Sequence, residues 1–210
     1  LGNGSTVDRL TPVLISDNVI FTDGGDQHTL FIKSDNTLWG MGNNSYGYLG
    51  NGTYMPSSVP ILITTNVKMA SAGYDHSLFI KNDGSLWGMG SNANGQLTNE
   101  APSTSTIPIH IADNVAKADA GIANTYYIDS GGILRGSGDN TYGQLGTGTT
   151  TSISGYTLIA TNVSDVSSGL GFVAYLKNDG SLWGCGDNTY GQLGTGDTNA
   201  RLAQCKLQQE

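Results

Sequence analysis

The chain has 210 residues, with nine Lys or Arg against seventeen Asp or Glu and a formal net charge of −8. Its few basic residues are scattered and form no patch that could neutralise phosphates, so we expect no nucleic-acid partner. No apolar run reaches the roughly 18–20 residues that cross a bilayer as a helix, so we expect no membrane span. The 31 glycines suit short strands joined by tight turns.

A repeat of 48 residues runs through the chain without insertion or deletion, and each unit opens with a leucine, at Leu1, Leu49, Leu97, Leu145 and Leu193. Repeats of this length made of short strands are typical of β-propellers, in which one repeat supplies one blade. We therefore expect a single propeller domain or propeller arc over 1–210, divided into 1–48, 49–96, 97–144, 145–192 and a partial unit, 193–210.

The second repeat shows the predicted elements most clearly. Its strands are expected at 59–63, 67–71, 76–81 and 85–90. Asn82-Asp83-Gly84 joins the last two, and Asp-Gly tolerates the positive φ angles of a tight hairpin turn. The proline that recurs in the first strand, as Pro60 here, marks that strand as a sheet edge. The fold class predicted is all-β, a propeller of four-stranded antiparallel blades.

Three glycine columns recur with the same period, beginning at Gly25, Gly40 and Gly47. We expect each column to reflect a positive φ angle or a close approach between backbones.

The partial unit adds one extra strand to the four repeats, because residues 201–208 repeat the strand expected at 11–15. These two segments compete for equivalent positions. We therefore expect an arc of a larger propeller, or a chain whose ring is completed by further blades or by copies of itself as a homo-oligomer, since open sheet edges favour association. A closed four-bladed monomer is the alternative.

Three motifs recur between the repeats, namely Gly-x-x-His-(Ser/Thr) at 25–29 and 73–77, Asp-Gly-x-Leu-Trp-Gly at 83–88 and 179–184, and Asn-x-x-Gly-Gln-Leu-Gly at 140–146 and 188–194. With the glycine columns, these motifs resemble the repeats of the regulator-of-chromosome-condensation family. The resemblance implies a propeller, typically of seven blades. The family includes nucleotide-exchange factors, ubiquitin-ligase modules and secreted bacterial inhibitors of β-lactamase. Its exchange factors act through an insertion, and no repeat here carries one.

The third and fourth repeats depart from the pattern. Asn124 stands at the histidine position of the third repeat, and Arg135 at its tryptophan position. Phe172 occupies the histidine position of the fourth.

No constellation of residues predicts catalysis, so we expect no enzyme, no catalytic residue and no cofactor. His28 and His76 are interpreted as partly buried structural residues bonding a neighbouring turn, because a metal site would need a third ligand. Carboxylates such as Asp23, Asp75 and Asp119 lie on polar loops and are expected to be solvated. The Asn/Gly-rich segments 139–148 and 187–196 lack the spacing of an EF-hand loop, so no metal is expected.

The two cysteines, Cys185 and Cys205, are interpreted as small buried hydrophobic residues. The alternative is a disulfide that ties the last strand to the fourth blade and requires an oxidising compartment.

The loop after the recurring glycine at 25, 73, 121 and 169 differs in every repeat while the scaffold stays constant. Variable loops on a rigid scaffold favour recognition of a shaped partner, although drift in a loop without function would look the same. Our first hypothesis is therefore a scaffold that binds a protein partner with one face. The contact residues predicted are Asp26, Tyr74, Asp75, Ile122 and Leu170.

The second hypothesis is a carbohydrate-binding propeller with one weak site per blade. Its stacking residues would be Tyr46, Tyr142 and Tyr190, whereas Trp39, Trp87 and Trp183 are expected to pack between blades. The third hypothesis is a structural surface module without a small ligand. Little Lys and much Asn, Thr and Gly are typical of an exported bacterial protein, so an extracellular or cell-surface location is expected.

Overall fold

The computed structural model describes residues 2–98 and 100–207. In this part the chain forms strands, turns and connections without a helix, so it contains no helix that could cross a membrane. Every strand is antiparallel to its partners, and the strands form four sheets of four. This arrangement confirms the predicted all-β propeller fold with four-stranded antiparallel blades.

The four sheets follow one another along the chain. The first contains β1 (Val19–Gly24), β2 (His28–Lys33), β3 (Leu38–Gly42) and β4 (Ser57–Thr64). The second contains β5 (Val67–Ala72), β6 (His76–Lys81), β7 (Leu86–Ser91) and β8 (Thr104–Ala112). The third contains β9 (Val115–Ala120), β10 (Asn124–Asp129), β11 (Leu134–Gly138) and β12 (Ile153–Ala160). The fourth contains β13 (Val163–Ser168), β14 (Phe172–Lys177), β15 (Leu182–Gly186) and β16 (Arg201–Lys206).

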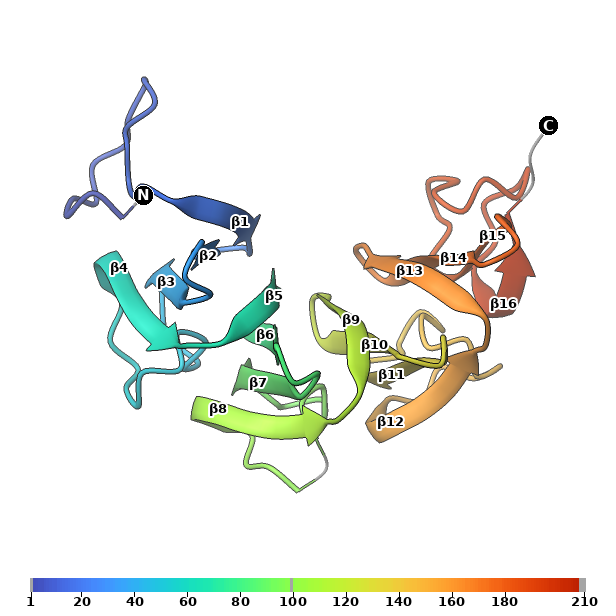
Figure 1. Ribbon diagram of the computed structural model, residues 1–210. Coiled ribbons are helices and arrows are strands. Elements are labelled where there is room, and N and C mark those ends of the chain that lie inside the picture. Colours follow the sequence, from blue (N-terminus) through green and yellow to red (C-terminus); the bar gives the residue numbers. More distant parts are fainter. Residues whose placement is uncertain (1, 99, 208–210) are drawn as a thin grey trace.

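Together the sheets form an open arc with the first and fourth sheets at its two ends (Figure 1). Strand order within each sheet follows the chain. The strands β1, β5, β9 and β13 lie on the inner side of the arc and contact one another in sequence, whereas β4, β8, β12 and β16 lie outside.

Each sheet begins one strand later than the repeat that the sequence defines. The strand expected at 59–63 lies within β4 and closes the first sheet as its outer edge, where Pro60 leaves no central ladder bond unmade. Residues 11–15, expected as the first strand of the first repeat, form no strand, whereas the expected extra strand forms as β16, which pairs with β15 and completes the fourth sheet. Completion of the ring by further blades or by copies of the chain stays a prediction.

Neighbouring sheets pack face to face. We name the face toward the next sheet in the chain the forward face, and the opposite one the rear face. A buried cluster joins the forward face of the first sheet to the rear face of the second, through Leu30, Ile32 and Leu38 on one side and Val67, Ala70, Phe79 and Met89 on the other. Similar clusters join the second sheet to the third and the third to the fourth. The core is therefore a series of interfaces between blades.

The repeated tryptophans are half-buried, and two of them lie beside these interfaces. Trp87 packs against the cluster between the first two sheets, and Trp183 packs against the cluster between the last two. A lysine ammonium lies over each ring, 4.9 Å from the centroid at Trp39, 4.6 Å at Trp87 and 4.4 Å at Trp183. Each indole is thus engaged by a cation–π contact within its own blade.

The link, the connection from the third to the fourth strand of a sheet, is held by one buried asparagine. In the third sheet the Nδ2 of Asn140 donates to the carbonyls of Thr149 (2.9 Å) and Thr151 (3.0 Å), and its Oδ1 accepts from the N–H of Leu145 (2.8 Å). Asn44, Asn92 and Asn188 make the equivalent bond to the leucine N–H at 2.9 Å. This satisfies link backbone that would otherwise be buried without partners.

Candidate functional site

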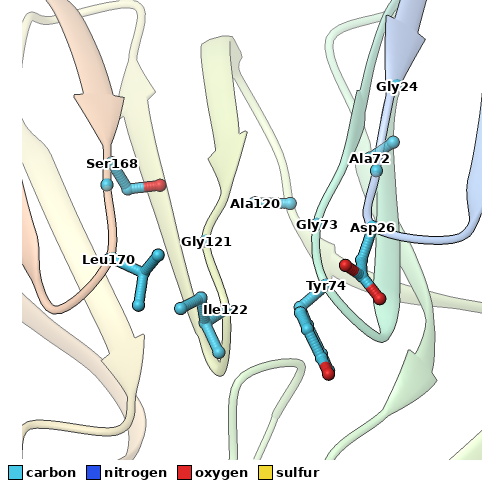
Figure 2. Close-up of a pocket in the computed structure, with 12 residues that line it drawn as sticks. Gly24, Asp26, Ala72, Gly73, Tyr74, Ala120, Gly121, Ile122, Ser168 and Leu170 are labelled. Carbon is cyan, nitrogen blue, oxygen red and sulfur yellow. The ribbon is translucent and has the colours of Figure 1, made fainter.

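The four loops that vary between repeats meet at one place. They connect β1 to β2, β5 to β6, β9 to β10 and β13 to β14, so all lie at the same end of the innermost strands. The loops line one pocket of about 220 Å³. Four of the five predicted contact residues line it, namely Asp26, Tyr74, Ile122 and Leu170, each projecting from its own loop (Figure 2). Asp75 is not among its lining residues.

A single repeat position supplies all four of these side chains, because each directly follows the recurring glycine. The glycine allows neighbouring loops to touch. The N–H of Asp26 donates to the carbonyl of Gly73 (3.3 Å), and the N–H of Tyr74 donates to that of Gly121 (3.2 Å). A Cβ at Gly73 would lie 2.6 Å from the oxygen of Gly121. Close backbone approach, one of the two predicted reasons, therefore explains this column.

The two other glycine columns reflect close packing in one case and a positive φ angle in the other. A Cβ at Gly88 would lie 2.7 Å from the side chains of Ile111 and Leu97, so that column also reflects close packing. Gly47 has φ of 86°, and its counterparts in the other links are also left-handed, so this column reflects a positive φ angle.

His28 and His76 support the loops from below. Both side chains are buried, and burial lowers the pKa of His28 to about 4 and that of His76 to about 3. Each Nε2 reaches the next sheet, where that of His28 lies 2.8 Å from Oγ of Ser77 and that of His76 lies 3.0 Å from Oγ1 of Thr125. The interpretation as structural residues agrees with this geometry, but the expected partner was wrong, since each contacts a strand of the next blade and not a turn.

The contact from a histidine to a hydroxyl of the next sheet is absent between the third and fourth sheets. Asn124 takes the histidine position there, and the residue one repeat and one position later is Val173, which has no side-chain acceptor. The Oδ1 of Asn124 is buried without a hydrogen-bond partner. Phe172 takes the same position in the fourth sheet. The blades therefore differ in how they hold the loops above them.

The carboxylates Asp23 and Asp119 were expected to be solvated. That expectation was wrong, because both carboxylates bridge neighbouring blades. Asp23 accepts from the N–H of Ala72 (2.9 Å), and Asp119 accepts from both the N–H (2.6 Å) and the hydroxyl (2.5 Å) of Ser168. Burial raises the pKa of Asp119, and the bonds from Ser168 oppose that rise. Burial also raises the pKa of Asp75, one of whose oxygens is buried without a partner.

Comparison with known families decides the family of this scaffold. A family model described as the regulator of chromosome condensation (RCC1) repeat matches residues 19–47, 67–96 and 163–192, and a second model of the same description matches 35–80 and 179–206. Together they cover more than half of the chain. The chain belongs to the regulator of chromosome condensation repeat family. The matches leave out residues 97–162, where Asn124 and Arg135 depart from the repeat.

Several solved structures share the fold. Human WBSCR16 has a TM-score of 0.82 and 24% identity, over 91% of this chain and 53% of that one. Yeast RCC1 (Prp20) bound to Kap60 has a TM-score of 0.81 and 18% identity, over 94% and 50%. Prp20p from Saccharomyces cerevisiae, described with its binding to Gsp1p and histones, has a TM-score of 0.82 and 18% identity, over 94% and 52%. The chain spans about half the length of these relatives, and no curated protein matches its sequence.

The tyrosines of the sugar hypothesis lie in the links of this RCC1 repeat scaffold, outside the pocket. Tyr46 is 47% exposed, Tyr142 51% and Tyr190 91%. The links and the variable loops leave the same end of the sheets, because two strands separate them. Tyr142 lies against Gly171, where a Cβ would be 2.8 Å from its ring. The two sets of predicted contact residues therefore share one face of the arc.

The Asp/Asn segments of the RCC1 repeat links are explained by bonds within the links. The carboxylate of Asp139 accepts from Thr141 (2.5 Å) and Gln144 (2.9 Å), and that of Asp187 accepts from Gln192 (2.8 Å). Among the described residues no group of three or more His, Cys, Asp or Glu side chains is placed to hold a metal ion.

Sequence reasoning missed the hydroxyl partners Ser77, Thr125 and Ser168. A signal existed, because every one of these bonds joins residues separated by one repeat plus one position. That offset places a residue beside its counterpart on the following blade.

Proposed function

We propose that this chain is a non-catalytic propeller scaffold that binds a protein partner through the pocket of the variable loops. We name this region, lined by Asp26, Tyr74, Ile122 and Leu170, the loop pocket. The observation that carries the proposal is that one repeat position supplies four different side chains to a single hollow. The backbone around them is fixed by loop-to-loop hydrogen bonds.

Exposure supports a binding role for these side chains. Leu170 is 79% exposed and Tyr74 is 50% exposed, although both are large and partly apolar. Contiguous exposed apolar side chains held on a rigid frame are typical of protein interaction sites. Aromatic residues in such sites often contribute much of the binding energy.

The chemistry of the loop pocket limits the partner. Ile122 and Leu170 offer an apolar wall, whereas Asp26 offers a carboxylate from the first blade. A matching partner would insert an apolar side chain and place a Lys or Arg near Asp26. The net charge of −8 would attract such a basic segment over a distance set by the salt concentration.

Relatives in the same fold support a protein partner. Yeast RCC1 (Prp20) is described as bound to Kap60, and Prp20p as binding Gsp1p and histones. These partners belong to those proteins, and this chain spans only about half of each. They support the class of partner, not its identity.

The test is selection of binders from a displayed peptide library against the wild-type chain. Each selected peptide is then measured against Leu170→Asp and Tyr74→Ala. We expect both variants to weaken binding about 10-fold or more, which corresponds to about 1.4 kcal/mol. The matched control is Leu158→Asp, because Leu158 is 55% exposed on the outer strand β12. Binders that respond to Leu158→Asp and not to the loop variants would refute the proposal.

A second candidate is carbohydrate binding through the link tyrosines. The observation that favours it is the exposure of Tyr190, Tyr142 and Tyr46 on the face of the loop pocket. Titrations with oligosaccharides and with the selected peptides separate the two candidates. Several equivalent weak sites for the oligosaccharide, each lost with one Tyr→Ala variant, would support the sugar site, whereas one peptide site per chain that is sensitive to Leu170→Asp would support the protein site.

We further propose an extracellular or cell-surface location, on the composition alone. Protease treatment of intact source cells tests it. Digestion of the chain before the cells lyse would support the location, and protection until lysis would refute it.

A further inference from the structure

The third and fourth variable loops are not joined as the earlier loops are. Backbone hydrogen bonds connect the first loop to the second and the second to the third. Among the described residues no such bond joins Ile122 of the third loop to Gly169 of the fourth. The side chains of Ile122 and Leu170 stand on these two facing loops and line the loop pocket (Figure 2). We name this meeting of loops, at Ile122, Gly169 and Leu170, the open junction. Both blades that flank it lie within the described chain.

One buried amide oxygen faces the open junction from below. Asn124, at the start of β10, is 4% exposed, and its Oδ1 has no hydrogen-bond partner. A Cβ at Gly121 would collide with this oxygen and would lie 3.1 Å from Oγ of Ser168. Gly121 and Ser168 both line the loop pocket. Two oxygens from neighbouring blades therefore converge where the third loop carries no side chain.

Ser168 cannot satisfy Asn124, because it donates its single hydroxyl proton to Asp119. The same carboxylate also accepts from the N–H of Ser168. Among the described residues Asp119 makes no ion pair, and the lining of the loop pocket contains no Lys or Arg. The open junction therefore offers an unused acceptor near an unpaired carboxylate.

The two preceding junctions show how the chain fills the same place elsewhere. There the imidazoles of His28 and His76 reach the hydroxyls of Ser77 and Thr125. Val173 stands in the corresponding place of the fourth sheet and has no polar group in its side chain. A buried acceptor without a partner costs free energy, so a donor that enters from outside the chain is stabilised here.

We propose that the open junction takes a lysine side chain of the protein partner, an inference that rests on the proposed function of the loop pocket. The methylenes pack between Ile122 and Leu170, and the ammonium donates to Oδ1 of Asn124 and faces the carboxylate of Asp119. This refines the apolar side chain proposed above, since a lysine carries an apolar stem with a cation at its end.

A lysine fits this chemistry better than an apolar residue or an arginine. An apolar side chain leaves Oδ1 of Asn124 without a partner, whereas an ammonium supplies three N–H groups in different directions. The planar guanidinium of arginine suits two oxygens of one carboxylate, but the acceptors here belong to separate side chains, those of Asn124 and Asp119. The net charge of −8 favours the approach of a cationic partner.

The first experiment titrates the full, isotope-labelled chain with n-butylammonium, which copies a lysine side chain, and follows the titration by NMR. The backbone amides of Ile122 and Gly169 and the side-chain amide of Asn124 should shift to saturation. n-Butanol has the same stem without the charge and should bind at least about 10-fold more weakly. Shifts that do not saturate or that spread over the surface, or equal affinities for the two probes, would overturn the proposal.

The second experiment closes the open junction by restoring the contact of the earlier blades. Asn124→His with Val173→Thr places an imidazole opposite a hydroxyl. The carbonyl of Gln144 stands, by the repeat, where that of Tyr48 accepts from Ser77, so the new hydroxyl also has an acceptor. This double variant should bind n-butylammonium at least about 10-fold more weakly than the unaltered chain. Unchanged affinity in the folded double variant would overturn the proposal.

A single variant keeps the proposal testable if the double variant fails to fold. Asn124→Leu replaces the amide with an apolar group of similar size and should weaken n-butylammonium binding to the same extent. The matched control is Asn94→Leu, the same change at an exposed position of a link, which should leave the affinity unchanged. Equal effects from the two variants would contradict the role assigned to Asn124.

Peptides selected against the unaltered chain separate this inference from the proposed function. Each lysine of a selected peptide is replaced with norleucine, which keeps the stem and loses the ammonium. One such replacement should weaken binding at least about 10-fold on the unaltered chain, but by less than about 2-fold on Asn124→Leu. Peptides that respond to Leu170→Asp but tolerate every norleucine replacement would overturn the lysine site and leave the loop pocket as the binding site. Peptides indifferent to Leu170→Asp would refute the proposed function, and the lysine site with it.

Discussion

The Nε2 of His28 in β2 lies 2.8 Å from Oγ of Ser77 in β6, on the neighbouring sheet. Ser77 has one hydroxyl proton and donates it to the carbonyl of Tyr48 at 2.8 Å. The hydroxyl must therefore accept from His28, which places the imidazole proton on Nε2. Two blades and a link are joined through one buried serine.

Replacing Ser77 with Ala removes this junction. The Nε2–H of His28 and the carbonyl of Tyr48 both lose a partner in a buried site, so we expect a loss of about 2–4 kcal/mol in the free energy of unfolding. Urea unfolding followed by fluorescence measures it. Ser58→Ala in β4, at an exposed position, is the control and should change the value by less than about 0.5 kcal/mol. Equal effects from the two variants would contradict the role assigned to Ser77.

Acidification should destabilise the fold through the two buried histidines. Burial lowers the pKa of His28 to about 4 and of His76 to about 3, from an ordinary 6.5. Below pH 6.5 both histidines bind protons in the unfolded chain but not in the folded chain. Their contribution to stability is therefore fully present above that pH and is lost as the pH falls toward their pKa values in the folded chain. Each histidine contributes at most about 1.4 kcal/mol per pH unit.

Urea unfolding between about pH 7.5 and pH 5 measures this slope. Asp75 and Asp119 act in the opposite direction, because burial raises their pKa, and they act nearer the ordinary carboxyl range. The variant His76→Gln keeps a hydrogen-bonding side chain for Thr125 but cannot titrate, so its slope should be smaller than that of the unaltered chain. An unchanged slope would show that His76 does not carry the effect.

The 48-residue period predicted most of the fold, but it did not predict which strand begins each sheet. Strands expected at 67–71, 76–81 and 85–90 lie within a residue of β5, β6 and β7. The strand at 59–63 was placed in the wrong blade, because a tandem repeat has no internal mark that says where a sheet begins. Hydrogen bonding decides that boundary, and β4 bonds to β3.

The sequence predicted the part of the candidate site that a single repeat position supplies. Asp26, Tyr74, Ile122 and Leu170 share that position, so any closed or open ring brings them together. Asp119 was misjudged because its partner Ser168 lies on the next blade. Such a contact depends on the curvature of the arc, which a one-dimensional pattern does not contain.

The buried asparagine of each link offers a test of how the links are held. Asn140→Asp keeps the acceptor for the N–H of Leu145 but replaces the donor to Thr149 and Thr151 with an oxygen. Three oxygens would then face one another in a buried site, so we expect a loss of about 3 kcal/mol or more. Asn94→Asp, the same change at an exposed position of the preceding link, serves as the control and should cost less than about 0.5 kcal/mol. Thermal and urea unfolding should rank the two variants in the same order.

Thiol labelling should find the two cysteines free and unequal. Cys205 pairs with Gly184 across β15 and β16, so the neighbouring Cys185 points to the opposite face of the sheet, and the structure has both thiols free. Burial raises the pKa of Cys185 to about 12, which leaves almost no reactive thiolate, whereas Cys205 is only half-buried. In the folded chain an alkylating reagent should therefore label Cys205 first. Denaturation without reductant should expose two thiols, and a count of zero would instead establish the disulfide between them.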